Sequence, residues 1–141
     1  MDITSANSKV KLFSALTPAG LSFEGYSSDA GWASEAVQIA EARMGIDGKV
    51  SFGYTPNPVP MTFTFQPDSQ TIDQLNNIVT SSFVNKTPYV VQLIIDIPSI
   101  GKSFNCANGS ITTAKILPDG SKVLEPQTYT ITFESVTPSP L

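Results

Sequence analysis

The side chains of this sequence that could do chemistry are 12 carboxylates and a single thiol, since the chain contains no histidine. Two carboxylates can act together as general acid and general base, and Glu35 and Glu41 are the candidates for such a pair. A working pair needs a pocket that shifts the acidity of both groups, and the sequence indicates none. We therefore favour the interpretation that both side chains lie on solvated faces.

Other kinds of active site lack their essential residues. Cys106 has no histidine that could activate it as a nucleophile, so we expect it in the core or in a hairpin. The sequence has no Cys and His cluster with zinc-site spacing, and Gly45–Gly48 lacks the Lys-Ser/Thr of a phosphate-binding loop. These patterns predict a protein that is not an enzyme and that holds no metal and no cofactor.

The sequence is poor in charge for a soluble monomer. Charged residues make up 14% of it, with a net charge of -4, whereas surfaces of designed soluble domains are about 25–35% charged. Either much of the outer face packs against copies of the same chain, or this is simply a threonine-rich β protein. The acidic balance argues against nucleic-acid binding, which needs Lys and Arg. No apolar run approaches the roughly 20 residues of a membrane span, so we expect no membrane anchor.

Short stretches that alternate apolar and polar residues dominate the chain. The clearest is 128–134, in which Tyr129, Ile131 and Phe133 share one face. A period of two in residues of this kind predicts a half-buried antiparallel strand. By the same criterion we expect further strands at 10–16, 21–26, 50–54, 61–65, 89–97 and 104–116, the last interrupted by a turn or bulge at Asn108-Gly109.

One segment, 35–44, is ambiguous between helix and strand. Its Ala, Glu and Arg content suits a helix, whereas Val37 and Ile39 suit a strand. It leads to Asp47-Gly48, a strong hairpin signal, and a period of two resumes at 50–54. We therefore favour a strand.

The only convincing helix begins after Asp68 or Ser69, either of which can cap it, and ends near Asn85. Its apolar residues form one stripe at helical spacing: Ile72, Leu75, Val79 and Phe83, with Ile78 beside them. We expect this stripe to lie across an edge or a face of the sheet.

Two proline-rich segments should interrupt the sheet, because proline cannot donate to a strand ladder. Residues 55–60 are expected to form an extended loop, and the tail 137–141 should not continue a ladder. The loop could be a ligand for an SH3-like domain, but we favour a structural arm. Trp32 could stack on a base or a sugar, but a core or interface anchor is favoured. The chain is therefore expected to be a single domain, 1–141, mainly β with one helix.

Several segments together resemble the tail tube proteins of contractile-tailed bacteriophages, which are related to the tube proteins of secretion systems and pyocins. The resemblance depends on Gly31-Trp32, on the run from Ala36 to Ser51, on the strand from Met61 to Phe65, and on Gln66–Ser69 leading into the helix. It follows the order of elements through most of the chain, but in residue detail it covers only 31–75.

The resemblance implies a small β-sandwich or partial barrel with one flanking helix on the outside of a tube. Six subunits would form a ring whose hairpins complete a barrel between subunits around a central channel, and rings would stack. Partners would be the tail sheath, the baseplate and terminator proteins, with DNA passing through the lumen without specific binding. The protein would belong to the tail of a virion and would assemble in the cytoplasm of the bacterial host.

The resemblance also suggests roles for particular residues. Lumen walls in this family are typically acidic, and the candidates for the wall or rim are Glu35, Glu41, Asp47 and Glu134. The expected arm for contacts between stacked rings is Thr55, Pro56, Asn57, Pro58, Val59 and Pro60. The sheath-facing side of the helix would carry Asn76, Asn77 and Ser81.

Other functions stay open at this point. A β-sandwich module that binds carbohydrate or protein would use Trp32 as its anchor, and an enzyme would use the Glu35 and Glu41 carboxylates. Within the structural class, the chain could be a secretion-system tube ring or a tail terminator, which caps a tube and stays a single ring.

Overall fold

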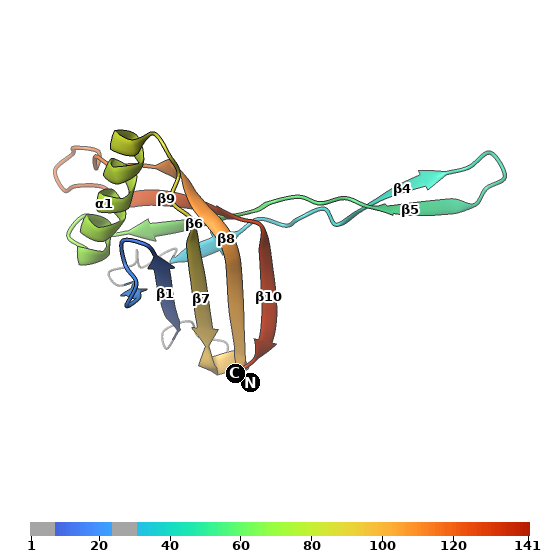
Figure 1. Ribbon diagram of the computed structural model, residues 1–141, viewed down its shortest axis with the longest axis horizontal. Helices are drawn as coiled ribbons and strands as arrows, with labels where there is room; N and C mark the ends of the chain where they lie inside the picture. Colours follow the sequence, from blue (N-terminus) through green and yellow to red (C-terminus); the bar gives the residue numbers. More distant parts are fainter. Residues whose placement is uncertain (1–7, 24–30) are drawn as a thin grey trace.

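A computed structural model describes residues 8–23 and 31–141 of the chain (Figure 1). The expected strand residues 24–26 lie outside these ranges. The described elements are β1 (Lys9–Ser14), β2 (Leu21–Ser22), β3 (Trp32–Ser34), β4 (Ala40–Met44), β5 (Val50–Tyr54), β6 (Val59–Phe65), α1 (Gln70–Asn85), β7 (Val91–Ile97), a 3-10 turn (Pro98–Ile100), β8 (Lys102–Ala114), β9 (Gln127–Phe133) and β10 (Ser135–Pro140). The fold is mainly β with one α-helix in the described ranges, as predicted.

The long strand β8 joins the two layers of a β-sandwich. Its first half pairs with β7 and β10, and its second half pairs with β9. The eight strands run in the order β2-β1-β7-β8-β9-β6-β3, with β10 beside β8, and every pairing is antiparallel. The layers face each other across the core, where the Cys106 Sγ of β8 lies 3.7 Å from the Met61 Sδ of β6.

A β-bulge lies in β8 at the position that the sequence indicates. Val91 pairs with Gly109 and Leu93 with Cys106, so β8 has one extra residue against β7. Asn108 takes up the left-handed conformation there, with φ 56°. A side chain at Gly109 would overlap the Phe133 ring. The bulge therefore needs a residue that tolerates positive φ and a glycine that leaves room for Phe133.

The predicted alternation buries one face of each central strand. In β9, Tyr129, Ile131 and Phe133 are fully buried, and Phe63 and Phe65 of β6 are buried with them. The Phe23 ring packs edge-on against both of these β6 rings, with a centroid distance of 5.3 Å in each case. This aromatic centre holds the layers together.

Helix α1 closes one end of the sandwich. Ser69 is its N-cap and accepts from Thr71 N, and Lys86 ends the helix in the left-handed conformation. Ile72, Leu75, Ile78 and Val79 are buried, as expected from the stripe. Phe83 is a correction, because 67% of its surface is exposed. The last turn extends past the core, and every residue from 83 to 88 is exposed.

The C-terminal tail corrects a second prediction. Although Pro138 and Pro140 were expected to exclude it from the sheet, β10 pairs with β8 through Pro140. Leu141 N donates to Gly101 O at 3.0 Å, and backbone groups alternate sides along a strand. The two proline nitrogens therefore face away from β8, so no ladder hydrogen bond is lost and the outer edge is blocked to further strands.

The segment 55–60 is only partly the expected loop. Thr55–Pro58 is irregular, but Val59 and Pro60 begin β6 and pair with Phe133 and Thr132. Pro60 O accepts a hydrogen bond from Glu35 N, at 3.3 Å. Proline is tolerated at this position because it stands near the start of a strand.

Candidate assembly interface

The hairpin formed by β4 and β5 projects far from the body of the molecule (Figure 1). We call this hairpin, residues 40–54, the arm. Gly45–Lys49 closes it: Gly45 N donates to Lys49 O at 2.8 Å, and Asp47 Oδ1 accepts from Lys49 N at 3.1 Å. Gly48 has φ 83°, a conformation that glycine takes without strain. The Asp47-Gly48 hairpin signal is confirmed. The strand interpretation of 35–44 is confirmed for Ala40–Met44, whereas 35–39 is irregular.

The two faces of this hairpin differ sharply in polarity. Three cross-strand pairs share one face, and all their members are apolar: Ala40 with Tyr54, Ala42 with Phe52, and Met44 with Val50. We call these six residues the arm face. Residues of the alternate register lie on the opposite face, because successive side chains of a strand point to opposite sides: Glu41, Arg43, Ser51 and Gly53.

No part of the body that the structure describes covers the arm face. Every residue of β4 and β5 is exposed, and the exposed fractions of Met44, Phe52 and Tyr54 are 70%, 72% and 83%. An isolated two-stranded hairpin is marginally stable at best in water. A hairpin with one wholly apolar and uncovered face is therefore a surface that another chain could complete.

The four predicted lumen acids lie at separate places rather than in one cluster. Glu35 is at the base of the arm, Glu41 is on its polar face 3.5 Å from Arg43, and Asp47 is at its tip. Glu134 lies between β9 and β10, where its carboxylate accepts from Asn108 Nδ2 at 2.6 Å. Glu35 and Glu41 are both exposed. The arm thus spreads three acids along its length.

The predicted inter-ring arm, 55–60, forms the stem of the projecting hairpin and not its far end. Thr55 N donates to Ile39 O at 3.1 Å, and Asn57 Nδ2 donates to Gln38 O at 2.9 Å. These bonds join the two sides of the stem. The part that reaches furthest from the body is 40–54, which the sequence presented only as a hairpin.

The three predicted sheath-facing residues of α1 differ in their surroundings. The Asn76 Oδ1 accepts from the Tyr129 hydroxyl at 2.5 Å, so this side chain faces the body. Burial raises the pKa of Tyr129 above its ordinary value, and the Asn76 hydrogen bond opposes that rise. Asn77 is exposed and Ser81 is half-buried. Only these two side chains remain candidates for an outer surface.

The end of the sandwich that α1 does not cover is open and apolar. A groove of about 260 Å³ lies at the end of β7 that is farther from α1 (Figure 1). We call it the mouth groove. The lining residues that the structure describes carry no charge: Trp32, Ser34, Met61, Ile95, Ile97, Phe104 and Val136. Trp32 packs against the core at its side. Sequence reasoning missed this groove because five strands contribute to it.

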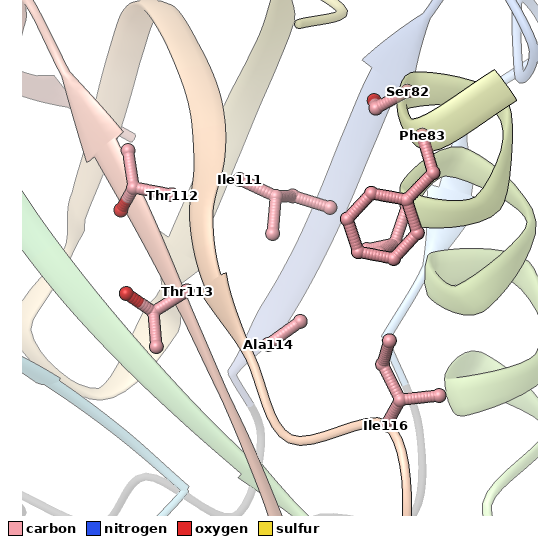
Figure 2. Close-up of a pocket in the computed structure, with 8 residues that line it drawn as sticks. Ser82, Phe83, Ile111, Thr112, Thr113, Ala114 and Ile116 are labelled. Atoms are coloured by element: carbon pink, nitrogen blue, oxygen red, sulfur yellow. The ribbon is translucent and has the colours of Figure 1, made fainter. Parts of the chain in front are cut away.

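A second hollow, of about 130 Å³, lies between α1 and the end of β8. Figure 2 shows the Phe83 ring directed from the helix toward Ile111, Ala114 and Ile116. Ser82, Thr112 and Thr113 also line it. The exposed Phe83 therefore forms one wall of a shallow surface hollow instead of packing in the core.

Residues that could hold a metal ion do not come together in residues 8–23 and 31–141, where no suitable group of His, Cys, Asp and Glu is found. Cys106 is fully buried, which raises the pKa of its thiol to about 11. The prediction that it is a core residue is confirmed. No helix in the described part of the chain is long and apolar enough to cross a membrane.

Comparison with known families identifies the class of protein. A family model described as "Tail fiber protein gp32" matches residues 1–137. The chain belongs to this family. It is therefore a tail-associated structural protein. No curated protein matches the chain in sequence.

Solved structures share the fold of this gp32-family chain. A chain of the anti-feeding prophage tube-terminating cap has a TM-score of 0.60 at 12% identity, covering 100% of this chain and 93% of the other. A chain of the sheath-tube complex of an extracellular contractile injection system, PVC, in the extended state also gives 0.60 at 12%, over 99% and 93%. A chain of the anti-feeding prophage baseplate gives 0.55 at 11%, over 99% and 97%. The fold is tail-tube-like, and the resemblance found in the sequence is confirmed.

Proposed function

We propose that this protein is the subunit of a tail tube: six copies form a ring, and rings stack into a hollow tube that conducts DNA during ejection. The observation that carries the proposal is the projecting β4–β5 hairpin with its uncovered arm face. A second copy that covered this face would bury the apolar surface that a monomer leaves in water. Head-to-tail contacts of this kind generate rings or helical filaments.

The outer face of β6, β9 and the end of β8 suits a channel wall. Thr62 pairs with Thr130, which pairs with Thr113, and Thr64 pairs with Thr128. This uncharged layer of hydroxyl groups would be wetted without attracting phosphates. Acids at the rim would add repulsion between the wall and DNA, and we assign this role to Glu35, Glu41, Asp47 and Glu134.

Stacking and sheath contacts complete the proposal. The segment 55–60 forms one side of the stem that joins the arm to the body, and we assign it the contact with a neighbouring ring. Asn77 and Ser81 of α1 would face the sheath, and Asn76 would support the helix from within through Tyr129. Baseplate and terminator proteins would bind the two ends of the tube. The assembled protein would reside in the virion tail after assembly in the host cytoplasm.

Negative-stain electron microscopy of the purified protein across a wide range of concentration tests this function. We expect rings with a central hole and stacks of such rings. Compact monomers at every concentration would overturn the proposal, and a saturable small ligand on such monomers would favour a carbohydrate- or protein-binding module instead.

A terminator ring is the second candidate, because the fold is equally similar to a chain of the anti-feeding prophage cap. The same images separate the candidates. A terminator should form single rings that do not stack with one another, whereas tube subunits should stack. Solid fibres without a channel would favour the fibre role that the family description names.

A further inference from the structure

Two apolar surfaces of this chain lack a covering element in the described structure, and they lie on different parts of it. One is the arm face on the β4–β5 hairpin, and the other is the mouth groove at the open end of the sandwich. Apolar surface left in water costs about 25 cal/mol per Å². Binding of a partner to either surface would therefore be favoured by the burial of apolar area.

The molecule exposes more area than a compact monomer of its size, and the excess is about the area of a protein–protein interface. The chain exposes 9108 Å². A compact monomer of 15.0 kDa is expected to expose about 7,000 Å². The difference of roughly 2,000 Å² is comparable with the area that a stable protein–protein interface buries in total.

The arm of one molecule does not reach the mouth groove of the same molecule. Trp32 and Ser34 of β3 line the groove, and the chain continues from β3 into the stem of the arm. From there the hairpin runs away from the body (Figure 1). Any contact between the two surfaces is therefore a contact between two copies.

The chemistry of the two surfaces is complementary. The arm face carries apolar side chains and a tyrosine hydroxyl, and the described lining of the groove consists of apolar side chains and Ser34. The polar face of the arm carries Glu41 and Arg43, which would be costly to bury in an uncharged groove. The hollow beside α1 suits the arm face less well than the mouth groove does, because it has half the volume of the groove and three hydroxyl side chains in its lining.

We infer that the arm face of one copy packs into the mouth groove of a second copy, with Phe52 as the central contact. The inference rests on the proposed tail-tube function and names the surfaces by which its subunits join. The contact is heterologous, so each copy offers one arm and one groove and the chain of contacts can continue through a ring or a tube.

Cross-linking between two singly substituted chains tests the inference. A tagged Ala42→Cys chain, which keeps Phe52 and places the thiol beside it on the arm face, and an untagged Val136→Cys chain are mixed, allowed to assemble and treated with a short bismaleimide. We expect a linked heterodimer on a denaturing gel. The buried Cys106, whose thiol pKa is about 11, should give no background, and wild-type protein checks this.

The matched control is Ser51→Cys, which also keeps Phe52 but places the thiol on the polar face, in the strand paired with that of Ala42. We expect little heterodimer from Ser51→Cys mixed with Val136→Cys. Equal yields from both arm variants, including no heterodimer from either, or links only between two Ala42→Cys arms, would overturn the inference.

A second variant separates this inference from the proposed function. Val136→Glu places a charge in the groove, and we expect loss of assembly with an unchanged circular dichroism spectrum and a folded monomer. If wild-type rings form but Val136→Glu assembles normally, this docking is wrong and the tube function stands. If the wild type never forms rings, the tube function itself fails.

Discussion

At the scale of single residues, the core is decided by side chains that alternate along β6 and β9. Phe63 is fully buried and meets the Phe23 ring edge-on. We expect Phe63→Ala to lower the free energy of unfolding by about 3–5 kcal/mol, because it removes a ring from a closed core. Chemical denaturation of the monomer measures this.

The control for this change is Phe52→Ala, which removes the same ring from an exposed position. Its effect on the unfolding of the monomer should stay within about 0.5 kcal/mol. Similar losses for both variants would show that the assignment of buried and exposed faces is wrong.

Cys106 makes stability depend on pH in the alkaline range. Burial raises the pKa of its thiol from 9.0 to about 11, so the folded chain keeps a proton that the unfolded chain releases. Between these values the unfolded state binds fewer protons, and the free energy of unfolding therefore falls as the pH rises. The slope contributed by one such group is at most about 1.4 kcal/mol per pH unit.

Denaturation of wild type and Cys106→Ala at a series of pH values checks this effect. The alanine variant is less stable at neutral pH because it leaves a small cavity, but its disadvantage should shrink between pH 9 and 11. A constant difference over that range would show that the native thiol titrates as it does in the unfolded chain.

At the scale of elements, local pattern was enough for most of the fold. The period of two located β6, β7 and β9, the capping residue and apolar stripe located α1, and Asp47-Gly48 located the tip of the arm. These features depend on residues close together in the chain. Phe83 is exposed because the last turn of α1 extends past the core, and the spacing of apolar residues along the helix does not show where the core ends.

The β10 strand and the candidate interface show where local pattern fails. Proline predicted a break at the tail, but the effect of proline depends on which side of a strand the nitrogen faces, and pairing with β8 sets that side. The mouth groove is built from five strands, so no single segment indicates it. Glu35 and Glu41 are exposed, as the sequence indicated, but the position of three acids along the arm and of Glu134 on the body needed the structure.

The arm should be separable from the folding of the body. We expect that replacing Ala40–Tyr54 with a short Gly-Ser turn leaves a folded sandwich, because every replaced residue of β4 and β5 is exposed. The variant should keep its thermal midpoint and lose assembly in analytical ultracentrifugation. A large drop in the midpoint would mean that the arm stabilises its own subunit, and assembly that survived would exclude it from the interface.

At the scale of the whole molecule, the monomer exposes more apolar surface than is usual for a protein in water. The sequence shows this as a low density of charge, 14% of residues, and the structure shows it as apolar surface on the arm and in the groove. Of the two explanations that composition left open, the proposed packing between copies would account for both surfaces. A threonine-rich β protein alone accounts for the outer face of β6 and β9 but not for an uncovered Phe52.

The driving force of assembly follows from the same surfaces and can be measured through its response to salt and temperature. If apolar burial drives the contact, sulfate should strengthen assembly and cooling should weaken it, because hydrophobic association gains from excluded salts and fades at low temperature. If ion pairs of Glu41 and Arg43 drive it instead, sodium chloride should weaken it, since exposed charges are screened within about 8 Å at physiological ionic strength. We expect the first behaviour in sedimentation and light-scattering titrations, with a negative heat-capacity change on association. Glu41→Gln, which removes one charge from the polar face, should leave both responses unchanged.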